Sequence, residues 1–236
     1  MKILAIDSSG LTASVAIVTE DAVLAEYNTN FKKTHSQTLL PMIDSIMSMT
    51  GIGKSELDAV AVAKGPGSFT GLRIGAGTAK GIALALNIPI IPVSTLEALA
   101  WTFSIYDGPI CPVMDARRAQ LYSAVYRFED TGTKVLCSDA ARSYEEVVKM
   151  LNTLGEEVIL TGDGLTPASD FLKTGLKVPF RFASVYENRQ RAAVLGDLAL
   201  KRAEAGEYTD PDRFAPVYLR PSQAERVRRK KESESQ

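Results

Sequence analysis

The chain has 236 residues, of which 45% are hydrophobic and 23% are charged, and its net charge is -1. This length and composition suit one large or two small domains with a sizeable core. The nearly neutral charge argues against a surface built for nucleic acid, so an RNA contact would need a local patch or a partner. No apolar run reaches the roughly 18 residues of a membrane span, and the N-terminus has no signal-peptide pattern. We therefore expect a cytoplasmic protein without membrane contact.

The first segment of the chain predicts a β-hairpin that is repeated later. Residues 3–18 contain an apolar strand ending at Asp7, a small polar turn and a second, alternating strand. Residues 112–128 repeat this pattern with Asp115 in the place of Asp7. A carboxylate suits such a turn because its side chain bonds nearby backbone N–H groups. We infer a duplicated architecture from this repeat.

The segments after each hairpin support the duplication. After the first hairpin, the patterns predict strands over 22–27, 57–63 and 88–93, and helices over 36–49, from the glycine-rich segment to Leu86, and from Ser94 to Phe103. After the second, they predict strands near 134–137 and over 158–160, and helices over 143–154 and 190–205.

Two βββαβα halves of this kind predict an α/β protein of the actin-like, sugar kinase and heat-shock ATPase (ribonuclease H-like) fold. Residues 1–104 would form the N-terminal half and residues 105–220 a smaller C-terminal half, with a linker over 104–109. Residues 221–236 carry many charges and no apolar pattern, so we expect a disordered tail. Its basic run, 226–231, would either keep the protein soluble or touch tRNA phosphates.

The glycine-rich segment 64–81 lies where an apolar strand passes into a helix. Two interpretations are open. A strand, a Gly/Ser/Thr loop and a helix N-terminus can hold a phosphate, because free N–H groups and the helix dipole favour an anion. Alternatively, residues without a Cβ let the helix pack closely against a neighbour.

Several motifs that suggest catalysis fail on spacing. Gly53-Lys54-Ser55 resembles the end of a Walker A loop, but Ser48 stands where the first glycine belongs. Residues 65–70 fail the dinucleotide pattern in the same way. The chain has one histidine, His35, so no histidine pair can bind a metal. We predict no metal site and expect His35 to bond the backbone at a helix N-terminus.

Six segments, taken together and in order, resemble the bacterial TsaB family. They are ILAIDSS at 3–9, HSQTLLPMI at 35–43, KGPGSFTGLRIG at 64–75, MDARRAQLY at 114–122, TGDG at 161–164 and PVYLR at 216–220. TsaB is similar in fold to TsaD, the catalytic subunit that attaches threonylcarbamoyl to the tRNA adenosine beside the anticodon. The resemblance implies a non-catalytic subunit that dimerises with a TsaD-like transferase and activates it. It also implies a TsaE-like ATPase partner, indirect contact with tRNA, self-association, and ATP used by the complex through its partners.

The resemblance also assigns positions. Where TsaD carries a His-x-x-x-His pair for its catalytic metal, this chain has Thr95 and Leu99. No residue is therefore assigned a catalytic role. Arg117 and Arg118 replace small residues of the superfamily's phosphate loop. The positions that match nucleotide contacts, and that form a possible vestigial site, are Asp7, Ser8, Ser9, Asp115, Gly162, Asp163 and Gly164.

A partner subunit needs a second apolar face on its helices. Methionines on the helix over 36–49 suit an adaptable interface, and glycines four apart in the next helix allow two backbones to approach. The family resemblance implies pairing through these helices, while a fully buried helix is the alternative. The predicted interface residues are Leu40, Met42, Ile46, Met49, Gly71, Arg73, Ile74, Gly75, Gly77 and Gly81.

Two other functions stay open at this point. The chain could be a stand-alone ATP-binding phosphotransferase of the actin-like superfamily, or a homodimer with a separate structural role. The missing histidine pair and P-loop spacing, together with the family resemblance, favour the partner subunit. In that interpretation, the glycines of 64–81 serve mainly for packing.

Overall fold

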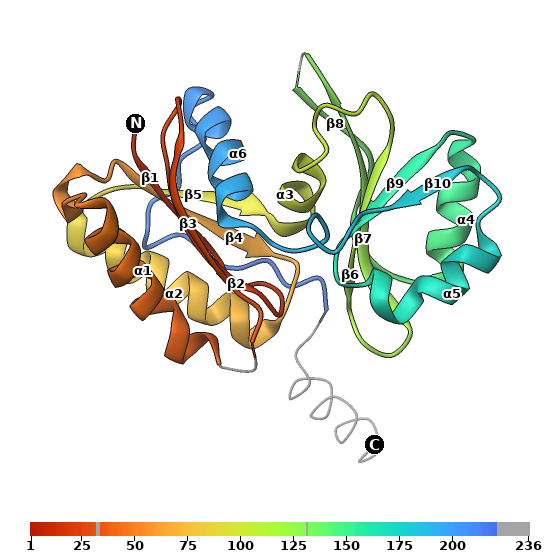
Figure 1. Cartoon of the computed structure of the whole chain (residues 1–236), viewed down its shortest axis with the longest axis horizontal. Helices are drawn as coiled ribbons and strands as arrows, with labels where there is room; N and C mark the ends of the chain where they lie inside the picture. The colour runs from red at the N-terminus through yellow and green to blue at the C-terminus, as the bar shows by residue number, and fades with distance from the viewer. Residues whose placement is uncertain (32–33, 131, 221–236) are drawn as a thin grey trace, which may run out of the picture.

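A computed structural model describes residues 1–31, 34–130 and 132–220, and the predicted tail over 221–236 lies outside this part of the chain. Two five-stranded sheets lie side by side, each with helices on its faces (Figure 1). This arrangement confirms the predicted α/β fold class. None of the helices in the described ranges is long and apolar enough to cross a membrane.

The first sheet has the strand order β3-β2-β1-β4-β5. Its strands are β1 (Ile3–Asp7), β2 (Ala13–Val18), β3 (Val23–Thr29), β4 (Ala59–Gly65) and β5 (Ile90–Ser94). The helices of this part of the chain are α1 (His35–Thr50), α2 (Phe69–Leu86) and α3 (Thr95–Trp101), with a short 3-10 helix at Lys54–Glu56.

The second sheet has the order β10-β9-β6-β7-β8, which repeats the topology of the first sheet. Its strands are β6 (Ile110–Asp115), β7 (Gln120–Glu129), β8 (Gly132–Ser143), β9 (Val158–Thr161) and β10 (Phe180–Phe182). The helices are α4 (Tyr144–Leu154), α5 (Leu165–Gly175) and α6 (Ala192–Glu204). The hairpins β1–β2 and β6–β7 occupy equivalent places, as the sequence repeat predicts.

The second half differs from the sequence prediction in three elements. Strand β8 is much longer than the predicted segment near 134–137, and α5 and β10 were not predicted. The α5 segment contains Pro167 and is rich in small and polar residues, which weakens its helix pattern. The second helix of this half is therefore α5, and the predicted helix over 190–205 is an additional element, α6.

The first sheet is apolar on both faces because helices cover both faces. Along β1, Ile3 and Ala5 face α6, whereas Leu4 and Ile6 face α1 and α2. The residues of β4 on the α6 side are the small side chains Ala59, Ala61 and Ala63. This alanine-rich face allows α6 to lie close to the sheet.

Helices α3 and α6 each pack on the sheet of the other half of the chain. Helix α3 follows β5 but packs with the second sheet, while α6 follows β10 but packs on the first sheet. They contact each other at the centre of the molecule (Figure 1), where Arg202 binds Glu97 and the Trp101 indole donates to Asp197. The predicted division at 104/105 therefore needs a correction, because α6 and much of the segment 209–217 pack on the N-terminal half.

A substitution at Gly196 provides a test of how closely α6 packs on the first sheet. A Cβ at this position would come within 2.7 Å of a Val18 methyl and 3.2 Å of the Ala5 Cβ. We expect Gly196→Ala to lower the free energy of unfolding by about 1–3 kcal/mol, because the added methyl overpacks the core. Chemical denaturation followed by circular dichroism measures this change.

Gly77→Ala on α2 is the matched control. Outside the helix's own backbone, no atom of the described residues lies within 4 Å of a Cβ built at Gly77, so the same substitution is expected to stabilise the helix by about 0.5–1 kcal/mol. Equal stability of the two variants would contradict the packing of α6 on the first sheet.

Candidate functional site

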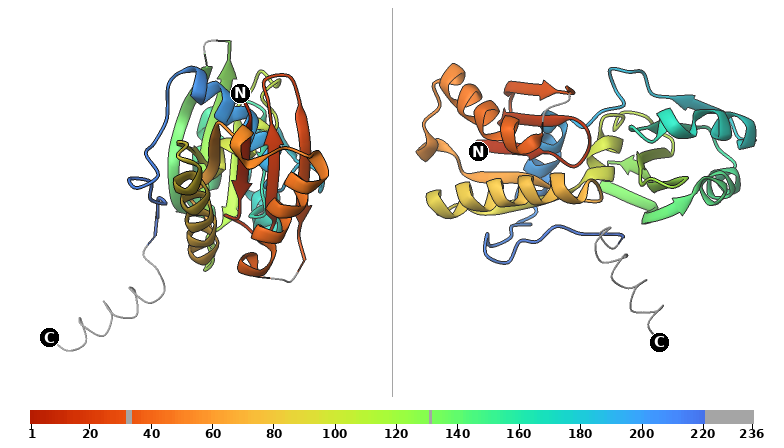
Figure 2. Two further views of the ribbon diagram at one scale, coloured as in Figure 1. Left: turned by 90° about the vertical axis from the view of Figure 1, so that its left-hand side faces the viewer. Right: turned by 90° about the horizontal axis from the view of Figure 1, so that it is seen from below.

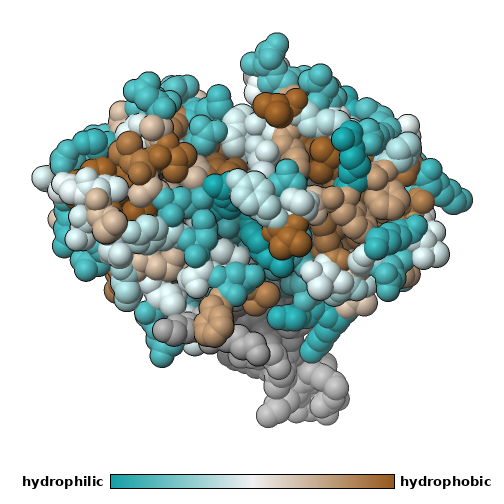
Figure 3. Space-filling view, viewed as in Figure 1, coloured by the Kyte–Doolittle hydropathy of each residue, from teal (hydrophilic) through white to brown (hydrophobic). Residues whose placement is uncertain are grey.

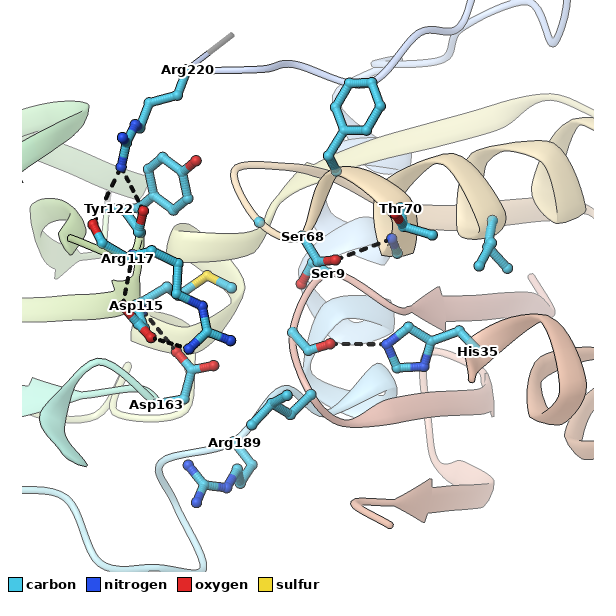
Figure 4. Close-up of a pocket in the computed structure, with 18 of the residues that line it drawn as sticks. Ser9, His35, Ser68, Thr70, Asp115, Arg117, Tyr122, Asp163, Arg189 and Arg220 are labelled. Carbon is cyan, nitrogen blue, oxygen red and sulfur yellow. Dashed lines mark hydrogen bonds and ion pairs between the residues drawn. The ribbon is translucent and has the colours of Figure 1, made fainter. Parts of the chain in front are cut away.

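A cleft of about 1060 Å³ separates the two halves. One wall comes from the β1–β2 turn and the beginning of α1 and α2, and the other from the β6–β7 turn and the start of α5 (Figure 4). The outer face where the halves meet is mostly hydrophilic (Figure 3). This cleft is the candidate functional site, and the groups on its two walls determine whether it can bind a phosphate.

The first wall is closed by contacts between the β1–β2 turn and the loop before α2. The Ser68 N–H donates to the Ser9 carbonyl at 2.7 Å, and the Ser8 hydroxyl donates to the Gly71 carbonyl at 2.9 Å. The Ser68 hydroxyl caps α2 by accepting from the Gly71 N–H. Two backbone donors at the N-terminus of α2, the N–H groups of Ser68 and Gly71, are thus already bonded within the chain.

The absence of a Cβ at Gly71 is necessary for this contact. A Cβ there would lie 2.1 Å from the Ser8 carbonyl oxygen, and one at Gly67 would lie 2.3 Å from the Ser9 carbonyl oxygen. The glycines thus bring the loop onto the turn of the same half. This geometry agrees with the packing interpretation of the glycine-rich segment.

Asp7 lies beneath this wall and is 1% exposed. Its Oδ1 accepts from the Ser9 N–H at 2.9 Å and from the Ser9 hydroxyl at 2.6 Å. Burial raises the pKa of Asp7 to about 6, although the two bonds from Ser9 favour the carboxylate. The side chain therefore supports the turn from below and is not among the groups lining the cleft.

In the second wall, three backbone N–H groups of the β6–β7 turn donate to groups of the same chain. Asp163 Oδ1 accepts from the Asp115 N–H at 3.2 Å, and Asp115 Oδ1 accepts from the Arg117 N–H at 2.7 Å. The Ala116 N–H donates to the Gln120 carbonyl. Burial raises the pKa of Asp163, while the bond from Asp115 and the nearby arginines lower it. The carboxylates of Asp163 and Asp115 therefore occupy the N–H groups of Asp115 and Arg117, which could otherwise bind an anion.

Arginine side chains supply the positive charge of the cleft. Arg117 pairs with Asp115 at 3.0 Å, and residues 117–119 all have positive φ, which is uncommon outside glycine. Arg189 lies between the two walls in Figure 4, and Arg220 reaches the β6–β7 turn from the C-terminal segment. Arg189 had no sequence signal, whereas Arg220 belongs to the PVYLR segment.

The predicted nucleotide positions divide into two groups. Ser9, Asp115 and Asp163 line the cleft. The glycines of the TGDG segment are buried against β6, since a Cβ at Gly162 would lie 2.1 Å from the Val113 carbonyl oxygen. Ser8 is also buried, 2% exposed. The complete predicted set is therefore not brought together as one surface, and nucleotide binding itself stays a prediction.

His35 lies where the sequence predicts, in the first turn of α1. Its Nε2 donates to the Gly10 carbonyl at 2.9 Å, which confirms the predicted backbone bond. Thr95 and Leu99 are buried, and no group of three or more potential metal ligands occurs in the described part of the chain.

The predicted partner interface needs correction at three positions. Ile46 lies on the inner face of α1 and is fully buried, and Gly71 and Gly75 are buried against the β1–β2 turn. A Cβ at Gly75 would lie 2.4 Å from the Ser8 hydroxyl. These residues pack within the chain and cannot contact a partner while this fold is kept.

The other predicted positions on α2 remain accessible. Arg73, Gly77 and Gly81 are exposed, and Leu84, which was not predicted, is 50% exposed. Their spacing of four, four and three residues places them on one helix face. We call this surface, formed by Arg73, Gly77, Gly81 and Leu84, the α2 stripe. Ile74 is half-buried beside it.

The exposed apolar residues of α1 do not form such a stripe. Leu40 is 58% exposed and Met49 is 76% exposed, while Met42 is half-buried. Leu40 and Met49 are nine residues apart, which places them on opposite margins of the exposed face of the helix. Of the two helices, α2 therefore offers the more continuous surface.

Comparisons with known proteins agree with the architecture. The sequence profile of the family described as TsaD, tRNA N6-adenosine threonylcarbamoyltransferase, matches residues 22–230. The tRNA threonylcarbamoyladenosine biosynthesis protein TsaB of Bacillus subtilis (strain 168) is 34% identical over 225 residues, covering 95% of this chain and 96% of the relative. The solved structure of YeaZ from Pseudomonas aeruginosa is similar with a TM-score of 0.79 and 27% identity, covering 92% of this chain and 99% of that chain.

A more distant structure shows the fold alone. Component A of the (R)-2-hydroxyglutaryl-CoA dehydratase of Acidaminococcus fermentans has a TM-score of 0.51 and 11% identity, covering 86% of this chain and 99% of that chain. The two repeated sheets and the cleft between them define a two-half α/β protein of the actin-like class. Within this class, the chain belongs to the TsaB family.

The buried carboxyl of Asp7 predicts a pH-dependent stability. An unfolded aspartate has a pKa of about 3.9, below the value of about 6 in the folded chain. As the pH rises, Asp7 therefore loses its proton in the unfolded chain before it does so in the folded chain. Its contribution to the free energy of unfolding falls progressively as the pH rises from about 4 to about 6. The loss is about 3 kcal/mol and is complete above the folded pKa.

Asp7→Asn removes this titration but keeps an oxygen that can accept from Ser9. Urea denaturation at pH 4 and pH 7.5 is expected to show the variant gaining about 3 kcal/mol relative to the wild type at the higher pH. Parallel pH dependence of the two proteins would contradict a raised pKa at Asp7.

Proposed function

We propose that this chain is a non-catalytic subunit in the biosynthesis of threonylcarbamoyladenosine in tRNA, and that it binds and activates a TsaD-like transferase. Its relatives carry the name of this pathway, and the family profile that matches it is that of the transferase. The proposal includes a TsaE-like ATPase as a further partner, indirect contact with tRNA, self-association, and ATP used through the partners.

The observation that carries the proposal is the two-sided character of α2. Its inner glycines, Gly71 and Gly75, pack on Ser8 of the β1–β2 turn within the same chain. Its outer glycines are open, since no atom of the described part of the chain, apart from the helix backbone itself, lies within 4 Å of a Cβ at Gly77 or Gly81. A helix with such a surface can receive a second helix at short distance.

The absence of a catalytic assignment rests on particular positions. Thr95 and Leu99 stand where the resemblance places the histidine pair of TsaD. Both belong to α3 and are buried, and Leu99 packs in the core between α3 and the second sheet. Neither side chain is a usual metal ligand. These positions support an accessory role for the chain.

The cleft supports one alternative, a stand-alone ATP-binding phosphotransferase. It is large, and Arg117, Arg189 and Arg220 could attract an anionic ligand. Equilibrium binding of ATP and phosphate release by the purified chain separate the two functions. Tight binding with turnover in the absence of any partner would favour this alternative.

The central experiment uses the TsaD-like protein from the same cell. We expect the two chains to co-purify, and threonylcarbamoyl transfer to tRNA to require this chain in addition to the transferase and the ATPase partner. Equal transfer with and without this chain would refute the proposed role.

The α2 stripe makes the partner surface testable. Leu84→Glu places a charge on the stripe and is expected to weaken binding to the TsaD-like subunit at least tenfold, about 1.4 kcal/mol. The matched control is Val185→Glu, which also replaces an exposed apolar residue by a charged one. Val185 is 81% exposed and lies in the second half. Titration calorimetry measures both affinities, and an equal loss in the two variants would argue against the stripe.

A further inference from the structure

The C-terminal segment 209–220 contains no helix, yet it is attached along the first half. Thr209 exchanges two backbone hydrogen bonds with Ile90, at 3.0 and 2.8 Å, at the edge of the sheet. The Lys80 ammonium of α2 donates to the carbonyls of Asp212 and Phe214, both at 3.2 Å. The Phe214 ring is buried in the core under α2. The segment is therefore fixed to α2 along one margin.

The same segment then passes beside the cleft. The Val217 N–H donates to the Lys64 carbonyl at 2.7 Å, and the Tyr218 ring lies 4.8 Å from the Phe69 ring. Gly65 accommodates this crossing, since it has a φ of 108° and a Cβ would lie 2.5 Å from the Val217 carbonyl oxygen. Figure 2 shows the segment running along α2 toward the second half.

The segment ends its described course on the opposite wall of the cleft. The Arg220 guanidinium donates to the carbonyl oxygens of Ala116 and Arg117 in the β6–β7 turn (Figure 4). Residues 217–220 all line the cleft. One short stretch of chain thus contacts β4 and α2 in the first half and the β6–β7 turn in the second.

This contact differs in position from the other links between the halves. The α3–α6 contacts lie at the centre of the molecule, and none of the described residues that line the cleft comes from α3 or α6. A bond across the cleft acts at a distance from that central contact, so it resists relative rotation of the halves more effectively than a bond at the centre. Charged donors also form stronger hydrogen bonds to carbonyls than neutral ones.

We propose that segment 209–220 is a strap that holds the two halves at a fixed separation across the cleft, with Arg220 as its anchor on the second half. The strap keeps the cleft in this arrangement without a ligand. The inference does not depend on the proposed function, because it concerns the geometry of the isolated chain.

Pulsed electron spin resonance on the full chain tests the strap. Spin labels at Thr34→Cys and Thr166→Cys report the width of the cleft, since both residues are exposed and line opposite walls. Cys137→Ser removes the half-buried native thiol, while Cys111 is buried. We expect Arg220→Ala to give a longer mean distance and a broader distribution than the wild type.

Arg213→Ala is the matched control. Arg213 lies on the same segment and is exposed, and the described structure shows no side-chain bond for it. This variant is expected to keep the wild-type distribution. Tyr218→Ala, which loosens the strap on the first half without changing Arg220, is expected to shift the distance in the same direction as Arg220→Ala.

Hydrogen exchange of the β1 amides verifies that each variant is folded. Unchanged protection of β1 together with a wider cleft in Arg220→Ala and Tyr218→Ala supports the strap. A folded Arg220→Ala or Tyr218→Ala chain whose distance distribution coincides with that of the wild type overturns it.

Discussion

The contact between α2 and the β1–β2 turn determines how the rest of this molecule is arranged. It depends on the absence of a side chain at Gly71, because any Cβ would overlap the Ser8 carbonyl. Once α2 lies against the turn, Ser68 and Ser8 bond across the contact, and the buried Asp7 supports the turn from below. The first wall of the cleft, the attachment of the strap and the orientation of the α2 stripe all follow from this position of the helix.

Much of the fold could be predicted from the sequence because its signals are local. The repeated hairpins, each with a carboxylate at the turn, predict the duplicated sheets, and the apolar run before Lys64 predicts a buried strand. The exchange of α3 and α6 could not be predicted. It depends on which sheet each helix covers, and an apolar face does not specify its partner. The alanines of β4 become informative only when α6 is seen against them.

The site was predicted less completely, for a related reason. Glycines four residues apart indicate two helix faces that can be approached closely, but the pattern does not say whether the neighbour is the same chain or another. In the structure, Gly75 faces Ser8, whereas a Cβ at Gly77 would meet no other described residue within 4 Å. Arg189 comes from a connection with no regular pattern, so only the folded chain reveals its place at the cleft. The glycine spacing of this helix does not indicate Leu84, which adds the apolar end of the stripe.

Helix α2 therefore connects three surfaces of the protein. Its first residues line the cleft, its outer face forms the α2 stripe, and Lys80 holds the C-terminal segment along one margin. At the first turn of α2, three side chains from these surfaces pack together. The Arg73 guanidinium lies 4.6 Å from the centre of the Phe69 ring, and the Tyr218 ring packs on the same Phe69 ring. A molecule that binds Arg73 on the stripe would contact the group of side chains that positions the strap. One helix therefore carries the contacts of the stripe, of the cleft wall and of the strap.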